Sequence, residues 1–180
     1  MHNHEDTVWD VVVIGGGPAG MMTAGRAGSL GKKVLLIEKN ESLGKKLLIT
    51  GGGRCNVTNA EEDLRVLLSK FKDSDKFLFS AFSQFSNKDT LEFFNKRGME
   101  TKVEAFGRVF PTSNTAQSVW NVLLEYLKTN NVTVLSNCPV TGLEKEENKI
   151  TAVVLKNKRK IKAKSFVLST GGKSHPETGS

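Results

Sequence analysis

Cysteine is scarce in this sequence, which has only Cys55 and Cys138 among its 180 residues. The two lie far apart and form no Cys-x-x-Cys pair, so neither a disulfide framework nor a Cys/His metal cluster is indicated. Histidine is scarce as well, and His2 and His4 stand beside the N-terminus. We therefore expect a protein of the reducing cytoplasm with no metal site.

Long apolar runs are also missing. No stretch approaches the length needed to cross a bilayer, and the N-terminal MHNHEDTVWD lacks the basic and apolar regions of a signal peptide. Hydrophobic residues make up 38% of the chain and charged residues 25%, a composition typical of a soluble globular protein. A membrane partner is not expected.

A formal net charge of +7 raises the question of nucleic acid. Much of the excess lies between Lys156 and Lys164, in a stretch without aromatic residues on which bases could stack. Edge strands often carry lysines on their polar face. The pattern favours a solvated strand, and a nucleic-acid surface remains the alternative.

The first forty residues predict a β-α-β unit. Residues 9–14 (WDVVVI) form an apolar, β-branched run typical of a buried parallel strand, and 34–38 (VLLIE) form a second one. Between them, 18–30 has small and apolar residues at helical spacing and begins with Pro18, which suits a first helical turn.

The rest of the chain predicts inserted helices and a meander. A loop-rich stretch is expected over 40–60, helices over 61–71, 73–97 and 116–131, a hairpin over 98–113, and strands over 132–137, 140–146, 149–156 and 159–170. We expect a core-facing apolar stripe in the second helix, made of Phe77, Leu78, Ala81, Phe82, Phe85, Leu91, Phe93 and Phe94. The order indicates an α/β, Rossmann-like domain with a parallel sheet and an antiparallel β-meander on one face.

Residues 15–20 (GGGPAG) satisfy the Gly-x-Gly-x-x-Gly fingerprint between the first strand and helix. Gly15 permits a tight turn, Gly17 lets the backbone approach a pyrophosphate, and Gly20 lets the helix lie close to the sheet. Glu38 ends the second strand, where a carboxylate accepts hydrogen bonds from ribose hydroxyls and repels the 2′-phosphate of NADP. The fingerprint predicts a dinucleotide and leaves FAD and NAD open.

A second glycine segment, 47–59 (LLITGGGRCNVTN), has three consecutive glycines before Arg54, Cys55 and Asn56. Consecutive glycines leave a run of N–H groups exposed to an anion, and Arg54 adds a fixed charge. A simple turn needs fewer glycines, so we interpret the segment as a ligand loop. A third segment, Ser169-Thr170-Gly171-Gly172, ends a strand with bare backbone that can lie beside a cofactor.

Together with GRVFPTSNTAQSV (107–119), these segments resemble the BaiN-like (YhiN-like) bacterial FAD-dependent flavoproteins, relatives of the fumarate reductase and glutathione reductase groups. The resemblance covers essentially the whole chain and implies non-covalent FAD. It implies cofactor-binding roles for a defined set of residues: Gly15, Gly17, Pro18, Ala19, Gly20, Glu38, Lys39, Lys46, Thr50, Gly51, Gly52, Gly53, Arg54, Cys55, Asn56, Val140, Thr170, Gly171 and Gly172.

The resemblance also implies a longer parent, because proteins of this family extend well beyond 180 residues. We expect residues 1–180 to be an incomplete FAD-binding domain, with the remainder of its own chain as a partner. The expected function is FAD-dependent hydride transfer to or from an unidentified small organic molecule, with NAD(P)H as a possible reductant. An NAD-dependent dehydrogenase domain and a non-enzymatic flavin- or nucleic-acid-binding module are the alternatives.

Two residues are candidates for catalysis, Cys55 and His175. Cys55 lies beside Arg54, which can lower a thiol pKa, but the Cys-x₄-Cys pair of disulfide-reducing flavoenzymes is missing. We favour a small residue packed in a cofactor loop. His175 follows the third glycine segment and has the chemistry of an acid or base, although a loop histidine without a role is the simpler interpretation.

Overall fold

The computed structural model describes residues 8–172. Its contacts divide the chain into two compact units, the first made of residues up to 47 and from 123 onward, the second of residues 48–122. Within the described residues, none of the helices combines the length and apolar character that a bilayer crossing requires.

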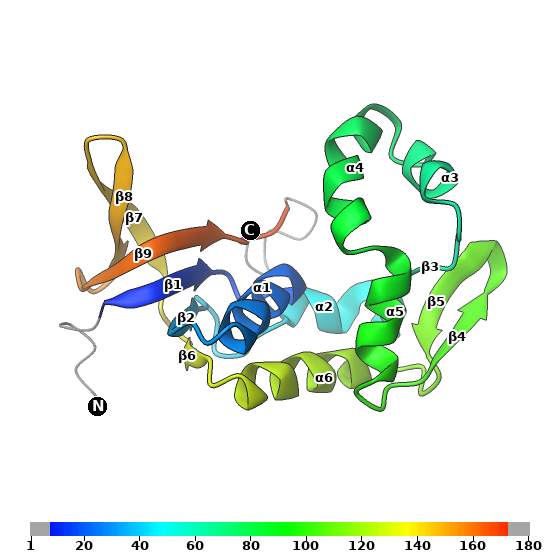
Figure 1. The fold of residues 1–180 in the computed structure, drawn as a ribbon. Coiled ribbons are helices and arrows are strands. Elements are labelled where there is room, and N and C mark those ends of the chain that lie inside the picture. Colours follow the sequence, from blue (N-terminus) through cyan, green and yellow to red (C-terminus); the bar gives the residue numbers. More distant parts are fainter. Residues whose placement is uncertain (1–7, 173–180) are drawn as a thin grey trace. The chain divides into compact units, whose positions relative to one another are not determined.

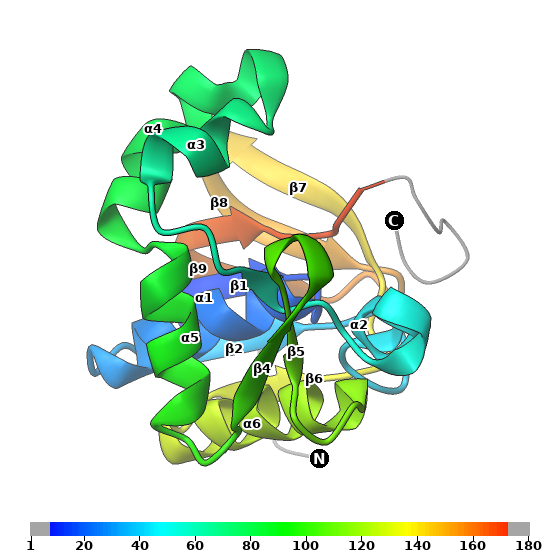
Figure 2. The same cartoon turned by 90° about the vertical axis from the view of Figure 1, so that its right-hand side faces the viewer.

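The first unit contains a six-stranded sheet in the order β6-β2-β1-β9-β8-β7 (Figures 1 and 2). The parallel strands are β1 (Trp9–Ile14), β2 (Val34–Ile37), β6 (Thr133–Leu135) and β9 (Lys160–Leu168). Strands β7 (Val140–Glu146) and β8 (Lys149–Leu155) pair antiparallel and join the sheet through β9. The predicted α/β class, with its parallel sheet and meander, is confirmed.

The meander covers one face of the parallel strands. Alternate residues of β1 and β2, among them Val12 and Leu35, pack with Val153 of β8 and Ile161 of β9 in one buried cluster. Helix α1 (Pro18–Ser29) contacts β1 and β2 and buries Met21. Strands β1 and β2 are therefore covered on both faces, which explains their continuous apolar sequences.

The second half of the basic run, from Lys160 to Lys164, lies on β9 with its lysines outward. Lys160, Lys162 and Lys164 are exposed while the intervening Ile161 and Ala163 are buried. Lys160 forms an ion pair with Glu144, and Lys164 forms one with Asp10. This alternation is that of a solvated strand face, and two of its charges are balanced by acids of the same unit.

The second unit contains a small antiparallel sheet in the order β3-β5-β4, made of β3 (Thr58–Asn59), β4 (Thr101–Glu104) and β5 (Arg108–Pro111). The predicted hairpin over 98–113 is present. The remaining helices of this unit are α3 (Leu64–Ser69), α4 (Asp75–Gln84) and α5 (Asn87–Asn95). The division between units falls inside α2 (Lys45–Ile49) and α6 (Ala116–Thr129).

The prediction of one helix over 73–97 is wrong. Helix α4 ends where Phe85 adopts an extended backbone, and α5 begins after Ser86. Ser86 and Asp89 form a reciprocal capping box, in which each side chain accepts from the other residue's backbone N–H. The cap starts a new helix and so divides the predicted one.

The predicted phenylalanine core is correct only for α5. Phe93 and Phe94 are buried, whereas Phe77 is 85% exposed and no residue of α4 is buried. Helix α4 contacts the short α3 and the turn that precedes it, through ring contacts such as Phe71 with Phe82. A six-residue helix is too small to cover the apolar face of α4.

Candidate functional site

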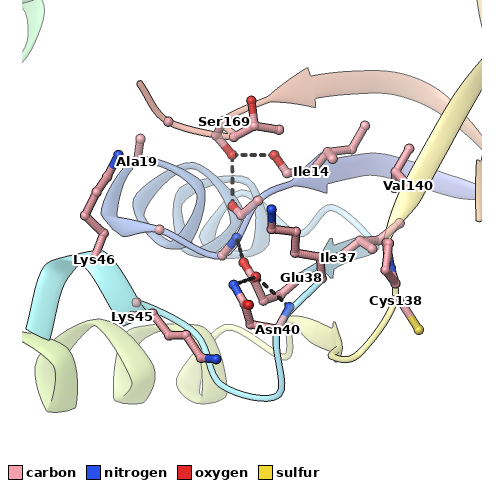
Figure 3. A pocket seen from close by; sticks show the side chains of 18 of the residues that line it. Ile14, Ala19, Ile37, Glu38, Asn40, Lys45, Lys46, Cys138, Val140 and Ser169 are labelled. Atoms are coloured by element: carbon pink, nitrogen blue, oxygen red, sulfur yellow. Dashed lines mark hydrogen bonds between the residues drawn. The ribbon is translucent and has the colours of Figure 1, made fainter. Parts of the chain in front are cut away.

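A pocket of about 190 Å³ lies in the first unit, where β1, β2 and β9 end (Figure 3). The carboxyl ends of parallel strands are where open α/β sheets bind ligands. The pocket is lined by five short segments of the chain: Ile14–Ala19, Ile37–Asn40, Gly44–Lys46, Cys138–Val140 and Ser169–Gly171.

The fingerprint positions are occupied by glycine for different structural reasons. Gly15 has φ +105°, and a Cβ on it would lie 2.5 Å from the carbonyl oxygen of Ser169. A Cβ on Gly20 would lie 1.9 Å from the carbonyl oxygen of Gly15. Gly17 has an ordinary φ of −76° and nothing within 4 Å of such a Cβ. Gly15 and Gly20 are required by the fold itself, while Gly17 leaves open space at the pocket.

Helix α1 begins at this open space. Its N-cap is Gly17, which offers no side-chain cap, Pro18 opens the helix, and the first turn carries no acid. The first N–H groups of a helix lack intrahelical partners, and this end of the macrodipole is positive. Within the described structure, the N-terminus of α1 is therefore suited to an anion, and an extended pyrophosphate would fit the space that Gly17 leaves.

Glu38 is the one acid among the residues that line this pocket, and it is 7% exposed. Its Oε2 accepts a hydrogen bond from the Gly16 N–H at 2.7 Å. Its Oε1 accepts two from Asn40, at 2.8 Å from the backbone N–H and 2.7 Å from Nδ2. A carboxylate has about four acceptor positions, so one on Oε2 is left for a ribose hydroxyl.

Lysines supply positive charge at the pocket. Lys39 and Lys45 are exposed at its rim, and Lys46 is half-buried. Lys46 donates from Nζ to the carbonyl oxygen of Gly172 at 2.9 Å, so α2 is linked to the segment that follows β9. Figure 3 shows Lys45 and Lys46 projecting from α2 in this region.

The strand end at 169–172 is fixed to the fingerprint loop. The Ser169 hydroxyl lies 3.0 Å from the carbonyl oxygens of both Ile14 and Gly15, and its N–H donates to Ile14. Thr170 and Gly171 line the pocket beside it. The structure thus brings the first and third glycine segments together, as their sequences predict.

The second glycine segment belongs to the second unit. Gly51, Gly52 and Gly53 have φ of +57°, +66° and +82°, so they form one left-handed turn. Each of these conformations is costly for other L-residues. The argument that a turn cannot account for three glycines is therefore wrong, because the backbone conformation favours glycine at all three positions.

Arg54 is engaged within its own unit. Its guanidinium forms an ion pair with Glu104, donates to Oδ1 of Asn114 at 2.8 Å, and lies 4.2 Å from the ring centre of Phe110. The Arg54 guanidinium holds the pKa of Glu104 below its ordinary value, mainly through their hydrogen bond. The expected fixed charge for an anion is thus balanced by an acid, and Arg54 anchors the glycine turn to the β4–β5 hairpin.

Cys55 follows this turn in a left-handed conformation with φ +58° and is 4% exposed. Burial raises the pKa of its thiol, and a hydrogen bond with Thr50 opposes that shift only in part. A reactive thiolate needs the opposite environment. The packed-residue interpretation is supported over the catalytic one. The other candidate, His175, lies outside the described residues.

Several pocket residues were not predicted. They are Ile14, Gly16, Ile37, Asn40, Gly44, Lys45, Cys138, Pro139 and Ser169. Gly16 has a clear packing reason, since a Cβ on it would lie 2.4 Å from the Leu43 side chain. Asn40 stands two residues after Glu38, and an asparagine so close to a buried acid is a signal that the sequence offered.

This arrangement of residues defines the class of binding site. A glycine turn against an uncapped helix N-terminus, followed by an acid at the end of the second strand, is the dinucleotide-binding site of a Rossmann-type domain. The chain belongs to the HI0933-like protein Rossmann domain family, whose model matches residues 9–180. The family resemblance read from the sequence is confirmed.

Curated relatives span almost the whole chain, and two of them are 32% and 34% identical to it. The ribosomal RNA dihydrouridine synthase of Escherichia coli is 32% identical over 95% of this chain and 41% of its own. The 3-dehydro-bile acid delta(4,6)-reductase of Clostridium scindens is 34% identical over 93% of this chain and 40% of its own. The chain therefore spans about two fifths of the length of these relatives.

Solved structures share the fold. A flavocytochrome c3 fumarate reductase in its open conformation matches with a TM-score of 0.72 and 21% identity, covering 93% of this chain and 34% of that one. The 3-ketosteroid-delta4-(5alpha)-dehydrogenase of Rhodococcus jostii matches with a TM-score of 0.67 and 16% identity, covering 93% and 46%. These identities support the fold assignment alone.

Proposed function

We propose that this chain binds FAD and belongs to a reductase that saturates a carbon–carbon double bond conjugated with a carbonyl group. The observation that carries FAD binding is Gly17, which neither its backbone angle nor a neighbouring atom requires to be glycine. The uncapped N-terminus of α1 and the remaining acceptor position of Glu38 support a pyrophosphate and a ribose at the same pocket.

The reaction class is supported by what the relatives' names have in common. Dihydrouridine arises by saturating the double bond of the uracil ring, which is conjugated with a carbonyl, and a 3-dehydro bile acid with delta(4,6) unsaturation is a conjugated ketone. When bound in its reduced form, FAD would supply a hydride to the alkene carbon distant from the carbonyl. The carbonyl oxygen would accept the displaced electron pair, and a proton would then add to the alkene carbon next to the carbonyl.

FAD is favoured over NAD by the further segment at 169–172, which a plain NAD domain does not need and of which Ser169, Thr170 and Gly171 line the pocket. In this proposal Lys39, Lys46, Val140, Thr170 and Gly171 contact the cofactor, since all five line the pocket. Gly172, which accepts from Lys46, and residues 50–56 remain predicted contacts. NAD(P)H as reductant, further domains of the same chain as partners, and a cytoplasmic location also belong to the proposal.

Titration of the longest natural form of the protein with FAD, followed by flavin fluorescence, tests the binding. The reaction class is tested with the longest natural form of the protein, reduced anaerobically by NADH or NADPH and mixed with a conjugated steroid ketone, its saturated analogue or a uridine-rich RNA. We expect flavin reoxidation by a conjugated substrate and none by the saturated ketone. A chain that takes up no FAD would refute the proposal, as would reoxidation that ignores the double bond.

A further inference from the structure

Asn40 lies in the pocket wall just after β2 and is the only side-chain donor among the three groups that donate to the Glu38 carboxylate. Its Nδ2 lies 2.7 Å from Oε1, and the other two donors are the backbone N–H groups of Gly16 and of Asn40 itself. Figure 3 shows the Asn40 side chain directed at the carboxylate. The Asn40 amide is therefore the side-chain contribution to the orientation of the buried acid, beside two backbone donors.

The backbone of Asn40 also links the end of β2 to the segment before β7, whose residues 138–140 line the pocket. The Asn40 carbonyl oxygen accepts from the Asn137 N–H at 2.9 Å, and the Glu38 carbonyl oxygen accepts from the Cys138 N–H at 2.9 Å. Residues 138–140 line the pocket. Glu38 and Asn40 thus join the fingerprint loop, the end of β2 and the segment before β7 in one hydrogen-bonded network.

A carboxylate held by several donors has a defined direction for its remaining lone pair. With Oε1 occupied twice, the position left on Oε2 is the one expected to receive a ribose hydroxyl. Loss of the Nδ2 donor would leave the carboxylate held only by the backbone N–H groups of Gly16 and Asn40, so its orientation about the terminal bond, a soft torsion, would be fixed less tightly. The ribose and the pyrophosphate loop would then be held less firmly, because the acid also binds Gly16.

We propose that Asn40 is a positioning residue for FAD, which acts by fixing the Glu38 carboxylate between the pyrophosphate loop and the ribose. This inference rests on the proposed function, because it assumes FAD in this pocket. It adds a determinant of cofactor affinity that lies outside the fingerprint and the acid.

Asn40→Ala removes the Nδ2 donor and keeps the backbone donor. Hydrogen bonds to charged groups are worth about 1.5–3 kcal/mol, so we expect the Kd for FAD to rise about tenfold or more. Asn157→Ala is the matched control, since Asn157 caps the Arg159 N–H in the β8–β9 turn and does not line the pocket. It should leave the Kd unchanged.

Asn40→Asp separates positioning from packing, because it keeps the shape and replaces the donor with a second carboxylate. Two adjacent carboxylates take up a shared proton more readily than an isolated one. The shared proton restores a donor to Glu38, so FAD affinity of this variant should recover from about pH 8 to about pH 5.5. Besides Glu38, the charged side chains among the residues lining this pocket are Lys39, Lys45 and Lys46, and Cys138 supplies a thiol.

The outcomes are distinct. Weak binding by Asn40→Ala at both pH values, with recovery of Asn40→Asp at the lower pH relative to the unchanged chain, supports the inference. Equal FAD affinity of the unchanged chain and Asn40→Ala would overturn it, and so would an Asn40→Asp deficit that does not depend on pH. If the unchanged chain itself binds no FAD, the proposed function fails instead.

Discussion

Gly17 and Gly20 provide a direct test of which fingerprint glycines serve the fold and which serve a ligand. Gly17→Ala places a methyl group in open space at an ordinary backbone angle. Alanine is a poorer N-cap than glycine, but it also restricts the unfolded chain, and each effect is about 0.5–1 kcal/mol. We expect the free energy of unfolding without ligand to change by less than about 1 kcal/mol.

Gly20→Ala places a methyl carbon 1.9 Å from the carbonyl oxygen of Gly15, which is backbone and cannot rotate away. Overpacking of this kind costs about 1–3 kcal/mol or more. For a domain of this size, each kcal/mol lowers Tm by about 2–4 °C, so a loss near the top of that range shifts Tm by roughly 6–12 °C.

For FAD binding, Gly17→Ala is the variant that should lose affinity, although it should lose little stability. In Gly17→Ala the methyl group occupies the space proposed for the pyrophosphate, and we expect the Kd for FAD to rise at least about tenfold. Thermal unfolding without FAD and a fluorescence titration with FAD measure the two quantities separately. If Gly17→Ala loses as much stability as Gly20→Ala, or binds FAD as well as the unchanged chain, the assignment of Gly17 to a ligand is wrong.

Other features of the structure give further expectations. Gly25→Ala should lower the free energy of unfolding in urea by about 1–3 kcal/mol, because its Cβ would lie 2.3 Å from the Tyr126 ring. An unchanged free energy of unfolding would contradict this close packing. Cys55 should react with iodoacetamide more slowly than a thiol of the unfolded chain at about pH 8, since burial raises its pKa, and a rate that matches the unfolded chain would contradict this. Arg54→Met should raise the pKa of Glu104 toward its ordinary value in a carboxyl NMR titration. Because the folded-state pKa is lowered, the ion pair stabilises the loop above the ordinary carboxyl range, and this contribution is lost as pH falls through the folded-state value.

The β-α-β unit and the meander could be predicted because each strand carries its own signal. Buried parallel strands such as Val34–Ile37 are apolar throughout, and β9 alternates exposed lysines with Ile161 and Ala163. Short elements gave no such signal. Helix α2 has five residues, less than two turns, so the loop predicted over 40–60 contained a helix that periodicity could not reveal.

Other errors came from partners distant in sequence. Arg54 was assigned to an anion because Glu104, fifty positions away, could not be placed beside it. The phenylalanines of α4 were assigned to a core because helical spacing says that an apolar face exists, not that anything covers it. The missed division of the helix at Ser86 did not come from a distant partner. Ser-x-x-Asp is a local N-cap signal that was available from the sequence.

Glycine itself is an ambiguous signal, and the structure separates its causes. Gly15, Gly51, Gly52 and Gly53 have positive φ, so the backbone conformation alone favours glycine there. Gly20 has no room for a side chain. A glycine indicates a ligand only where neither reason applies, and in the fingerprint that condition singles out Gly17. The three consecutive glycines first suggested a ligand most strongly, yet the stronger physical argument for a bound pyrophosphate comes from this single position with ordinary geometry and empty space around it.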